Sequence, residues 1–223
     1  MKKTSFALTL LSLCATASLS QAAIVSYTVQ AFDNTLATSN GTPLAEGSAW
    51  RLGTFATLSD SAIAAAASSG NYAVLNADWT SFVTGTIGGV DAAGPGTLFK
   101  TGTADNTGFT GKNAFVWVVN QPAFGPITGG TELGIFKSLN SSGNPSLKFP
   151  AADDIFDPFA FSFYLPSIPS NHIVFGGQGV GTNPLDPSVS AAPYNLAAPV
   201  PEPATTGMLF FIGAACLIRR RRA

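Results

Sequence analysis

Cysteine is nearly absent from this 223-residue chain, which contains two, Cys14 and Cys216. Each lies in an apolar segment close to one end of the chain, so the region between those segments has none. The absence excludes a disulfide framework, a cysteine nucleophile and a thiolate metal site from that central region. Acylation of Cys216 is one option, but we favour an ordinary small apolar residue of a helix.

Basic residues are also scarce between Ala23 and Pro199. This region has five basic and eleven acidic residues, which gives it a formal charge of −6. So few cations exclude a nucleic-acid-binding function, which requires Lys and Arg to neutralise phosphates. The only histidine of the chain is His172, and no serine lies in a Gly-x-Ser-x-Gly motif. Because a general base needs a positioned partner, we expect His172 to be a structural or surface residue.

Residues 1–22 have the pattern of a secretory signal peptide. Lys2 and Lys3 form a basic start, Phe6–Ala17 is apolar, and Ser20-Gln21-Ala22 has small residues at a cleavage site. The pattern predicts export by the Sec machinery and cleavage by signal peptidase between Ala22 and Ala23. An uncleaved anchor is the alternative, which the short and interrupted apolar run disfavours.

The region from 23 to 182 predicts one mainly β domain, an antiparallel, jelly-roll-like β-sandwich with one or two short helices. Strict apolar alternation over Ile24–Ala31 is typical of a half-buried strand. Helices are expected at Ser61–Ser68, with Ser59 or Asp60 as N-cap, and within Tyr72–Phe82. Glycine and proline separate further short strands: Trp50–Thr57, Thr97–Lys100, Ala114–Asn120, Leu133–Phe136, Phe159–Leu165 and Ile173–Phe175.

Among these strands, Ala114–Asn120 is apolar on both faces and is expected at the centre of a sheet. We expect it to form the core together with Phe159–Leu165. Residues 183–199 contain four prolines among small residues, which predicts an extended linker that holds the domain away from a membrane.

The C-terminal segment, residues 200–223, combines three features in order. Pro201-Glu202-Pro203 precedes the apolar stretch Ala204–Ile218, and the basic cluster Arg219, Arg220, Arg221 and Arg222 follows it. An apolar helix ending in arginines is a membrane stop signal with its basic end in the cytoplasm. The stretch would span about 22 Å against a hydrocarbon core of about 30 Å, so it is a short transmembrane helix.

These three features together resemble the PEP-CTERM sorting signal found on exported proteins of Gram-negative bacteria. The resemblance implies an exosortase as partner, cleavage near Pro201-Glu202-Pro203, and a chain anchored in the inner membrane before it reaches the cell surface. Four body segments are also similar to small PEP-CTERM proteins of unknown function: Gly41–Phe55, Phe109–Asn120, Glu132–Ser138 and Lys148–Pro150.

Asp153, Asp154 and Asp157 form the densest acidic cluster of the chain. Carboxylates at this spacing are weak candidates for calcium ligands, because the glycine and terminal glutamate of an EF-hand loop are missing. We favour a solvated turn and otherwise expect no cofactor or metal. A glycosidase that pairs these residues with Glu132 is a further alternative, since only three-dimensional separation identifies such a pair.

Three other patterns have a functional and a structural interpretation. Gly176–Gly181 superficially resembles a phosphate-binding loop, but it lacks the required spacing and predicts a turn. Thr84-Gly85-Thr86 and Thr101-Gly102-Thr103 resemble units of ice-binding arrays, although two units without a repeat are ordinary β-protein composition. Tryptophans can stack on sugars, but the core is the favoured place for the three in this chain: Trp50, Trp79 and Trp117.

The leading hypothesis is therefore an exported, non-enzymatic surface or matrix protein, with the exopolysaccharide or biofilm association that the family suggests. A carbohydrate- or calcium-binding module is the first alternative. A glycan-active enzyme that uses carboxylates between Asp153 and Asp157 is the second.

Overall fold

The computed structural model describes residues 24–31, 35–88, 94–126, 128–137, 148–149, 172–179 and 193–199, and the backbone of 159–162. Its strands and helices are β1 (Ile24–Ala31), β2 (Leu36–Ala37), β3 (Ala49–Phe55), α1 (Asp60–Ser68), α2 (Tyr72–Asp78), β4 (Trp79–Thr86), β5 (Leu98–Asp105), β6 (Phe115–Val119), β7 (Leu133–Lys137), β8 (Phe159–Ser162), β9 (Ile173–Phe175), β10 (Gly177–Gln178) and β11 (Tyr194–Asn195). The prediction of a mainly β domain is confirmed.

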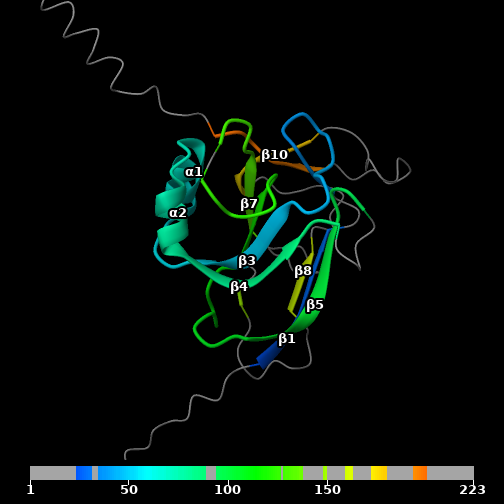
Figure 1. Ribbon diagram of the computed structural model, residues 1–223. Helices are drawn as coiled ribbons and strands as arrows, with labels where there is room; N and C mark the ends of the chain where they lie inside the picture. Colours follow the sequence, from blue (N-terminus) through cyan, green and yellow to red (C-terminus); the bar gives the residue numbers. More distant parts are fainter. Residues whose placement is uncertain are drawn as a thin grey trace, which may run out of the picture.

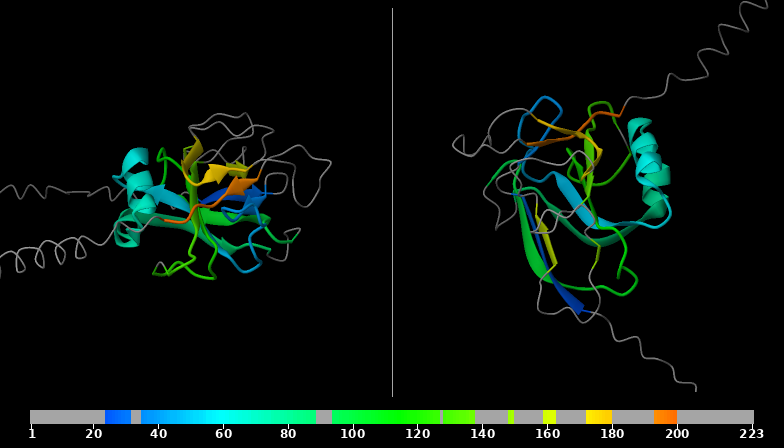
Figure 2. Two further views of the ribbon diagram at one scale, coloured as in Figure 1. Left: turned by 90° about the horizontal axis from the view of Figure 1, so that it is seen from above. Right: turned by 180° about the vertical axis from the view of Figure 1, so that it is seen from behind.

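The strands of the described region form three sheets. The largest has five strands in the order β4-β3-β6-β7-β9, and the others have the orders β5-β1-β8 and β10-β11-β2. Both helices lie on one side of the five-stranded sheet, and the β5-β1-β8 sheet lies on the other (Figures 1 and 2). The arrangement agrees with a sandwich of two sheets to which a layer of helices has been added.

Strand β6 occupies the centre of the large sheet, as predicted from its apolar sequence. All five of its residues are buried. Phe115, Trp117 and Val119 pack into the cluster under the helices, whereas Val116 and Val118 pack toward the β5-β1-β8 sheet. A strand with an apolar layer on each face needs apolar residues at every position, and this explains the continuous run.

Helix α1 begins where its capping residue predicts. The Ser59 hydroxyl accepts a hydrogen bond from the N–H of Ala62 at 3.3 Å, and Gly70 follows with a φ of 71°. The predicted second segment, Tyr72–Phe82, is helical only as far as Asp78. From Trp79 the backbone is extended (φ −84°, ψ 133°) because it pairs with β3 as strand β4.

Two strand pairs are parallel, so the expectation of a wholly antiparallel sandwich is wrong on this point. β1 pairs with β8, with Tyr27 opposite Phe159, and β11 pairs with β2, with Tyr194 opposite Leu36. β8 therefore belongs to a different sheet from β6. Parallel partners lie far apart in the sequence and are joined by no hairpin, so turn residues do not reveal them.

The predicted linker 183–199 is wrong for residues 193–199, which are part of the domain. Tyr194 and Leu196 are each 1% exposed. The Tyr194 N–H donates to the Thr35 carbonyl at 2.8 Å, and Ala197 exchanges two backbone bonds with Leu133 at 2.9 and 3.0 Å. The sequence did not predict that this segment folds, because Tyr194 and Leu196 are its only large apolar residues. Two alternating residues are too short a pattern to outweigh the four prolines of residues 183–199. Residues 183–192 lie outside the described residues.

Candidate functional site

Most residues predicted to have a function lie outside the described part of the chain. These are the sorting triplet Pro201, Glu202 and Pro203, the arginine cluster 219–222, the cleavage residues Ala22 and Ala23, and the acidic residues Asp153, Asp154 and Asp157. Within the described ranges, no three His, Cys, Asp or Glu side chains come together as metal ligands. The helices found there are too short or too polar to cross a bilayer, and the predicted segment 204–218 lies outside those ranges.

His172 is a buried residue, at 0% exposed, just before β9. Neither of its ring nitrogens has a hydrogen-bond partner among the described residues. Burial lowers the pKa of the imidazole, and the nearby charge of Lys137 lowers it further. Within the described residues the ring thus has no partner that would position it as a general base, and its structural role stays a prediction.

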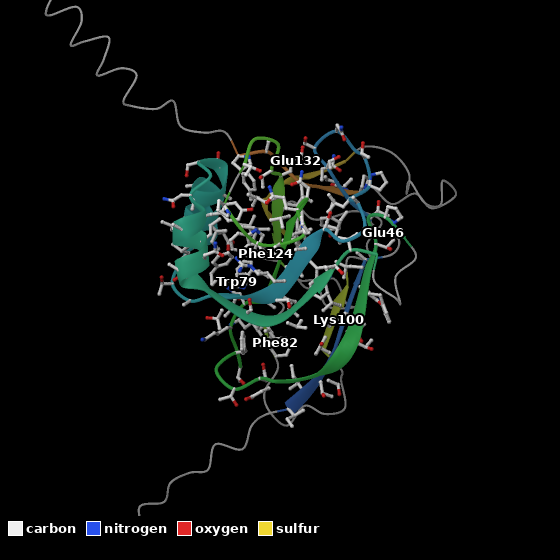
Figure 3. The ribbon with its side chains drawn as sticks, in the orientation of Figure 1. Glu46, Trp79, Phe82, Lys100, Phe124 and Glu132 are labelled. Carbon is white, nitrogen blue, oxygen red and sulfur yellow. The ribbon has the colours of Figure 1, made fainter. Side chains whose placement is uncertain are left out.

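Glu132 fixes a turn at one end of the molecule (Figure 3). Its carboxylate accepts hydrogen bonds from the Ser39 N–H at 2.8 Å and from the Ser39 hydroxyl at 2.5 Å. These bonds join β7 to the turn that follows β2. The described residues thus give Glu132 a structural task, whereas its suggested catalytic partners lie outside them.

The central glycines of the two Thr-Gly-Thr units each leave room for an aromatic ring of the neighbouring strand. Trp50 is the cross-strand partner of Gly85, and Tyr27 is that of Gly102. A Cβ at Gly85 would lie 2.5 Å from the Trp50 ring, and one at Gly102 would lie 2.9 Å from the Tyr27 hydroxyl. Packing of aromatic rings over strand glycines therefore accounts for both units.

Gly85→Ala is accordingly expected to destabilise the domain by about 1–3 kcal/mol, because the added methyl group displaces the buried Trp50 ring. Chemical denaturation followed by tryptophan fluorescence measures the change. Gly177→Ala is the matched control, since a Cβ there meets nothing within 4 Å. Equal midpoints for the two variants would contradict the packing explanation.

A buried arginine surrounded by aromatic rings lies between the large sheet and α2, and we call it the Arg51 cage. The Arg51 Cζ is 3.9 Å from the Trp117 ring centroid, 4.2 Å from that of Phe124 and 4.9 Å from that of Trp79. Its Nη2 donates to the Asn76 Oδ1 at 2.6 Å. Figure 3 shows Trp79 and Phe124 on the side of β3 that faces the helices.

Arg51 is only 9% exposed, and yet its charge has no carboxylate partner among the described residues. Burial lowers its pKa to about 10, so it remains protonated at neutral pH. Burial likewise raises the pKa of neighbouring Tyr72 to about 12, and the Arg51 charge only partly offsets this. Neither group exchanges a proton near pH 7, so Arg51 and Tyr72 do not form an acid–base pair at that pH. The contacts of the cage are those of a packing element.

In the sequence, Arg51 is one of the five basic residues between Ala23 and Pro199. The informative signal is its position inside the predicted strand Trp50–Thr57, and the structure shows that all seven residues of β3 are buried. Two tryptophans, Trp50 and Trp117, are 1% and 0% exposed and confirm the expected core role, while Trp79 is partly buried. An open hollow of about 560 Å³ lies beside the cage. Asn76 lines it together with Gly70, Asn71, Tyr72, Ala73, Gly125 and Pro126.

A second hollow lies at the other end of β3, and we call it the lysine groove. It measures about 320 Å³ and is lined by residues 54–60, residues 111–113, Phe115 and Lys148. One wall is formed by three backbone contacts: the Phe149 N–H donates to the Lys112 carbonyl, the Gly111 N–H donates to the Phe149 carbonyl, and Asn113 forms a bridge with Lys148. Asp60, on the opposite wall, makes an ion pair with Lys137.

Asp78 holds the loop that forms the opposite wall of the lysine groove. Its carboxylate accepts from the Thr57 N–H and hydroxyl, at 3.0 and 2.6 Å, and from the Leu58 N–H at 2.9 Å. Partial burial favours a higher pKa for Asp78, but these hydrogen bonds outweigh it and the pKa is lowered. The ionised carboxylate is therefore the form that fixes the loop.

A lowered pKa predicts how acid affects this loop. The stabilisation from ionised Asp78 is fully present above the unfolded-state pKa of about 3.9 and is lost as the pH falls through the lower folded-state value. Asp78→Asn is expected to lower stability at pH 7 and to reduce the further loss between about pH 5 and pH 2. Urea unfolding at several pH values tests this. An unchanged acid profile in the variant would contradict it.

Comparison with known proteins identifies the C-terminal segment. Residues 199–222 match the family model of the PEP-CTERM protein-sorting motif. No curated protein and no solved structure matches the chain. The sorting signal predicted from Pro201-Glu202-Pro203 and the segments after it is thus confirmed, whereas the similarity of the body to other small PEP-CTERM proteins stays a prediction.

Proposed function

We propose that this exported, exosortase-sorted chain is a non-enzymatic component of the cell surface or extracellular matrix. The observation that carries the proposal is the sorting motif at residues 199–222, which implies export and processing at the membrane. Association with exopolysaccharide or a biofilm is the setting that the motif family suggests. The inner membrane, the Sec machinery and signal peptidase are the other partners that we propose.

The end of the folded domain supports a role in display. The Ala197 backbone is bonded to β7, and the sorting motif begins two residues later, at 199. The domain therefore reaches the motif without the long spacer that the sequence suggested. A cut near Pro201-Glu202-Pro203 would leave a new C-terminus only a few residues from a fixed point on the fold.

Several carboxylates of the described region already have structural tasks, which supports the non-enzymatic part of the proposal. Glu132 binds Ser39, Asp60 pairs with Lys137, and Asp78 caps the loop after β3. A glycosidase of the common kind would require two carboxylates that flank the glycosidic bond. No cofactor is proposed. Turnover of any glycan by the purified protein would overturn this part of the proposal.

Intact-mass spectrometry of protein recovered from its native host tests the sorting route. The expected mass begins at Ala23 and ends near residues 201–203. A control chain with alanine at Pro201, Glu202 and Pro203 is expected to keep its tail. A native protein that retains Arg219–Arg222 would show that the segment is a permanent anchor and would contradict processing.

A further inference from the structure

The lysine groove gathers positive charge on a body that is otherwise acidic. Of the five basic residues between Ala23 and Pro199, Lys112 and Lys148 line the groove and Lys137 pairs with Asp60 on its wall. That ion pair neutralises Asp60. Lys112 and Lys148 are exposed, and neither makes an ion pair within the described part of the chain. Within the described residues, the groove therefore has two ammonium groups without an ion-pair partner.

Polar groups of the groove are held in fixed positions before any ligand arrives. The Thr57 hydroxyl donates to Asp78 at 2.6 Å, and the Ser59 hydroxyl accepts from the Ala62 N–H at 3.3 Å. Both oxygens keep a lone pair for a further bond. Asn113 lies opposite Lys148 in an isolated backbone bridge. Such preorganisation reduces the entropy lost on binding.

Phe55 and Phe115 line the bottom of the groove, where only 7% and 3% of their surface is exposed. The groove's volume of about 320 Å³ is at the lower end of the range for small-molecule sites, about 300–1,000 Å³. Fixed hydroxyl groups, the Asn113 amide and two cations together match a sugar ring that has an acidic group. An uncharged sugar would leave the ammonium groups unused, and a simple anion would leave the hydroxyl and amide groups unused.

We propose that the lysine groove binds an acidic saccharide, with the carboxylate of a uronate unit between Lys112 and Lys148. The sugar hydroxyls bond to Thr57, Ser59 and Asn113. The net charge of −6 on the body repels densely charged polymers at long range, whereas salt confines the attraction of the two lysines to about 8 Å. A short acidic oligosaccharide therefore meets less repulsion than a long, densely charged polymer. This binding goes beyond the proposed function, because it does not require the tail to be cut.

Calorimetric titration of the full chain in detergent with trigalacturonate tests the proposal. The double variant Lys112→Gln/Lys148→Gln is expected to bind at least about tenfold more weakly, since a charge-assisted hydrogen bond is worth about 1.5–3 kcal/mol. Lys112→Arg/Lys148→Arg is expected to keep the affinity within about threefold, because it keeps both charges. A carboxyl-reduced trisaccharide is expected to bind at least about tenfold more weakly than trigalacturonate.

Lys100→Gln provides the matched control, since Lys100 lies on β5 (Figure 3), is not among the residues that line the groove, and donates to the Thr84 carbonyl at 2.5 Å. Its affinity is expected to stay within about twofold of the original. The proposal is overturned if trigalacturonate gives no heat, if the double glutamine variant binds equally well, or if the reduced trisaccharide binds as tightly. Binding of oligothymidylate in place of the saccharide would assign the groove to phosphate polymers and also overturn it.

Discussion

Tyr194→Ala is expected to destabilise the domain by about 3–5 kcal/mol, the usual cost of removing a buried aromatic ring. The Tyr194 side chain is 1% exposed, and its ring packs edge-on against Phe136 with centroids 5.1 Å apart. It also lies in the segment that pairs with β2, so its loss weakens the contact between the two ends of the domain. Urea unfolding followed by circular dichroism measures the change.

Ala198→Ser is the control for Tyr194→Ala, because position 198 is exposed in the same segment. Its effect is expected to stay within about 0.5 kcal/mol. Truncation offers a second comparison: a body that ends at residue 199 is expected to fold, and one that ends at residue 192 is expected to lose its cooperative transition. Normal stability of the shorter body would restore the linker that the sequence predicted.

Arg51→Ala is expected to destabilise the domain by about 2–5 kcal/mol. The variant loses cation–π contacts with three rings, each worth about 0.5–2 kcal/mol, and it leaves a space beneath α2. Arg51→Met is expected to cost less than about 1.5 kcal/mol, because it fills the space and avoids the desolvation of a buried charge. Asn76 is exposed, so water can replace its bond to Arg51.

Comparing the two Arg51 variants separates packing from charge. If Arg51→Met and Arg51→Ala are equally unstable, then the cation itself, and not the filled volume, holds the cage together. Arg51→Lys keeps the charge but loses the planar stacking, and it is expected to fall between the two. Thermal unfolding of all three variants under one buffer condition gives this order.

Local patterns were sufficient for most elements of the fold. Alternation identified β1, the continuous apolar run identified β6, and Ser59 with Gly70 located α1. In each case the signal lies within about ten residues, because a single strand or helix imposes its own periodicity. The same logic identified the sorting tail, whose three features adjoin one another in the sequence.

Partners that lie far apart in the chain could not be predicted in this way. The parallel pairs, the burial of Tyr194 and Leu196 and the rings around Arg51 each bring together positions separated by tens of residues. Lys112 and Lys148 likewise line one groove only because residues 148–149 pair with residues 111–113. No short pattern records such contacts, since they depend on how sheets and helices pack.

The sequence by itself therefore determined where this protein goes, because a sorting signal is read as a linear segment by the enzymes that process it. Only the tertiary structure decided where the domain ends and which side chains share a site. Hydrogen bonding joins residues 193–199 to β2 and β7, and it turns an apparent linker into part of the core. Burial likewise changes Arg51 from an ordinary cation into the centre of an aromatic cage.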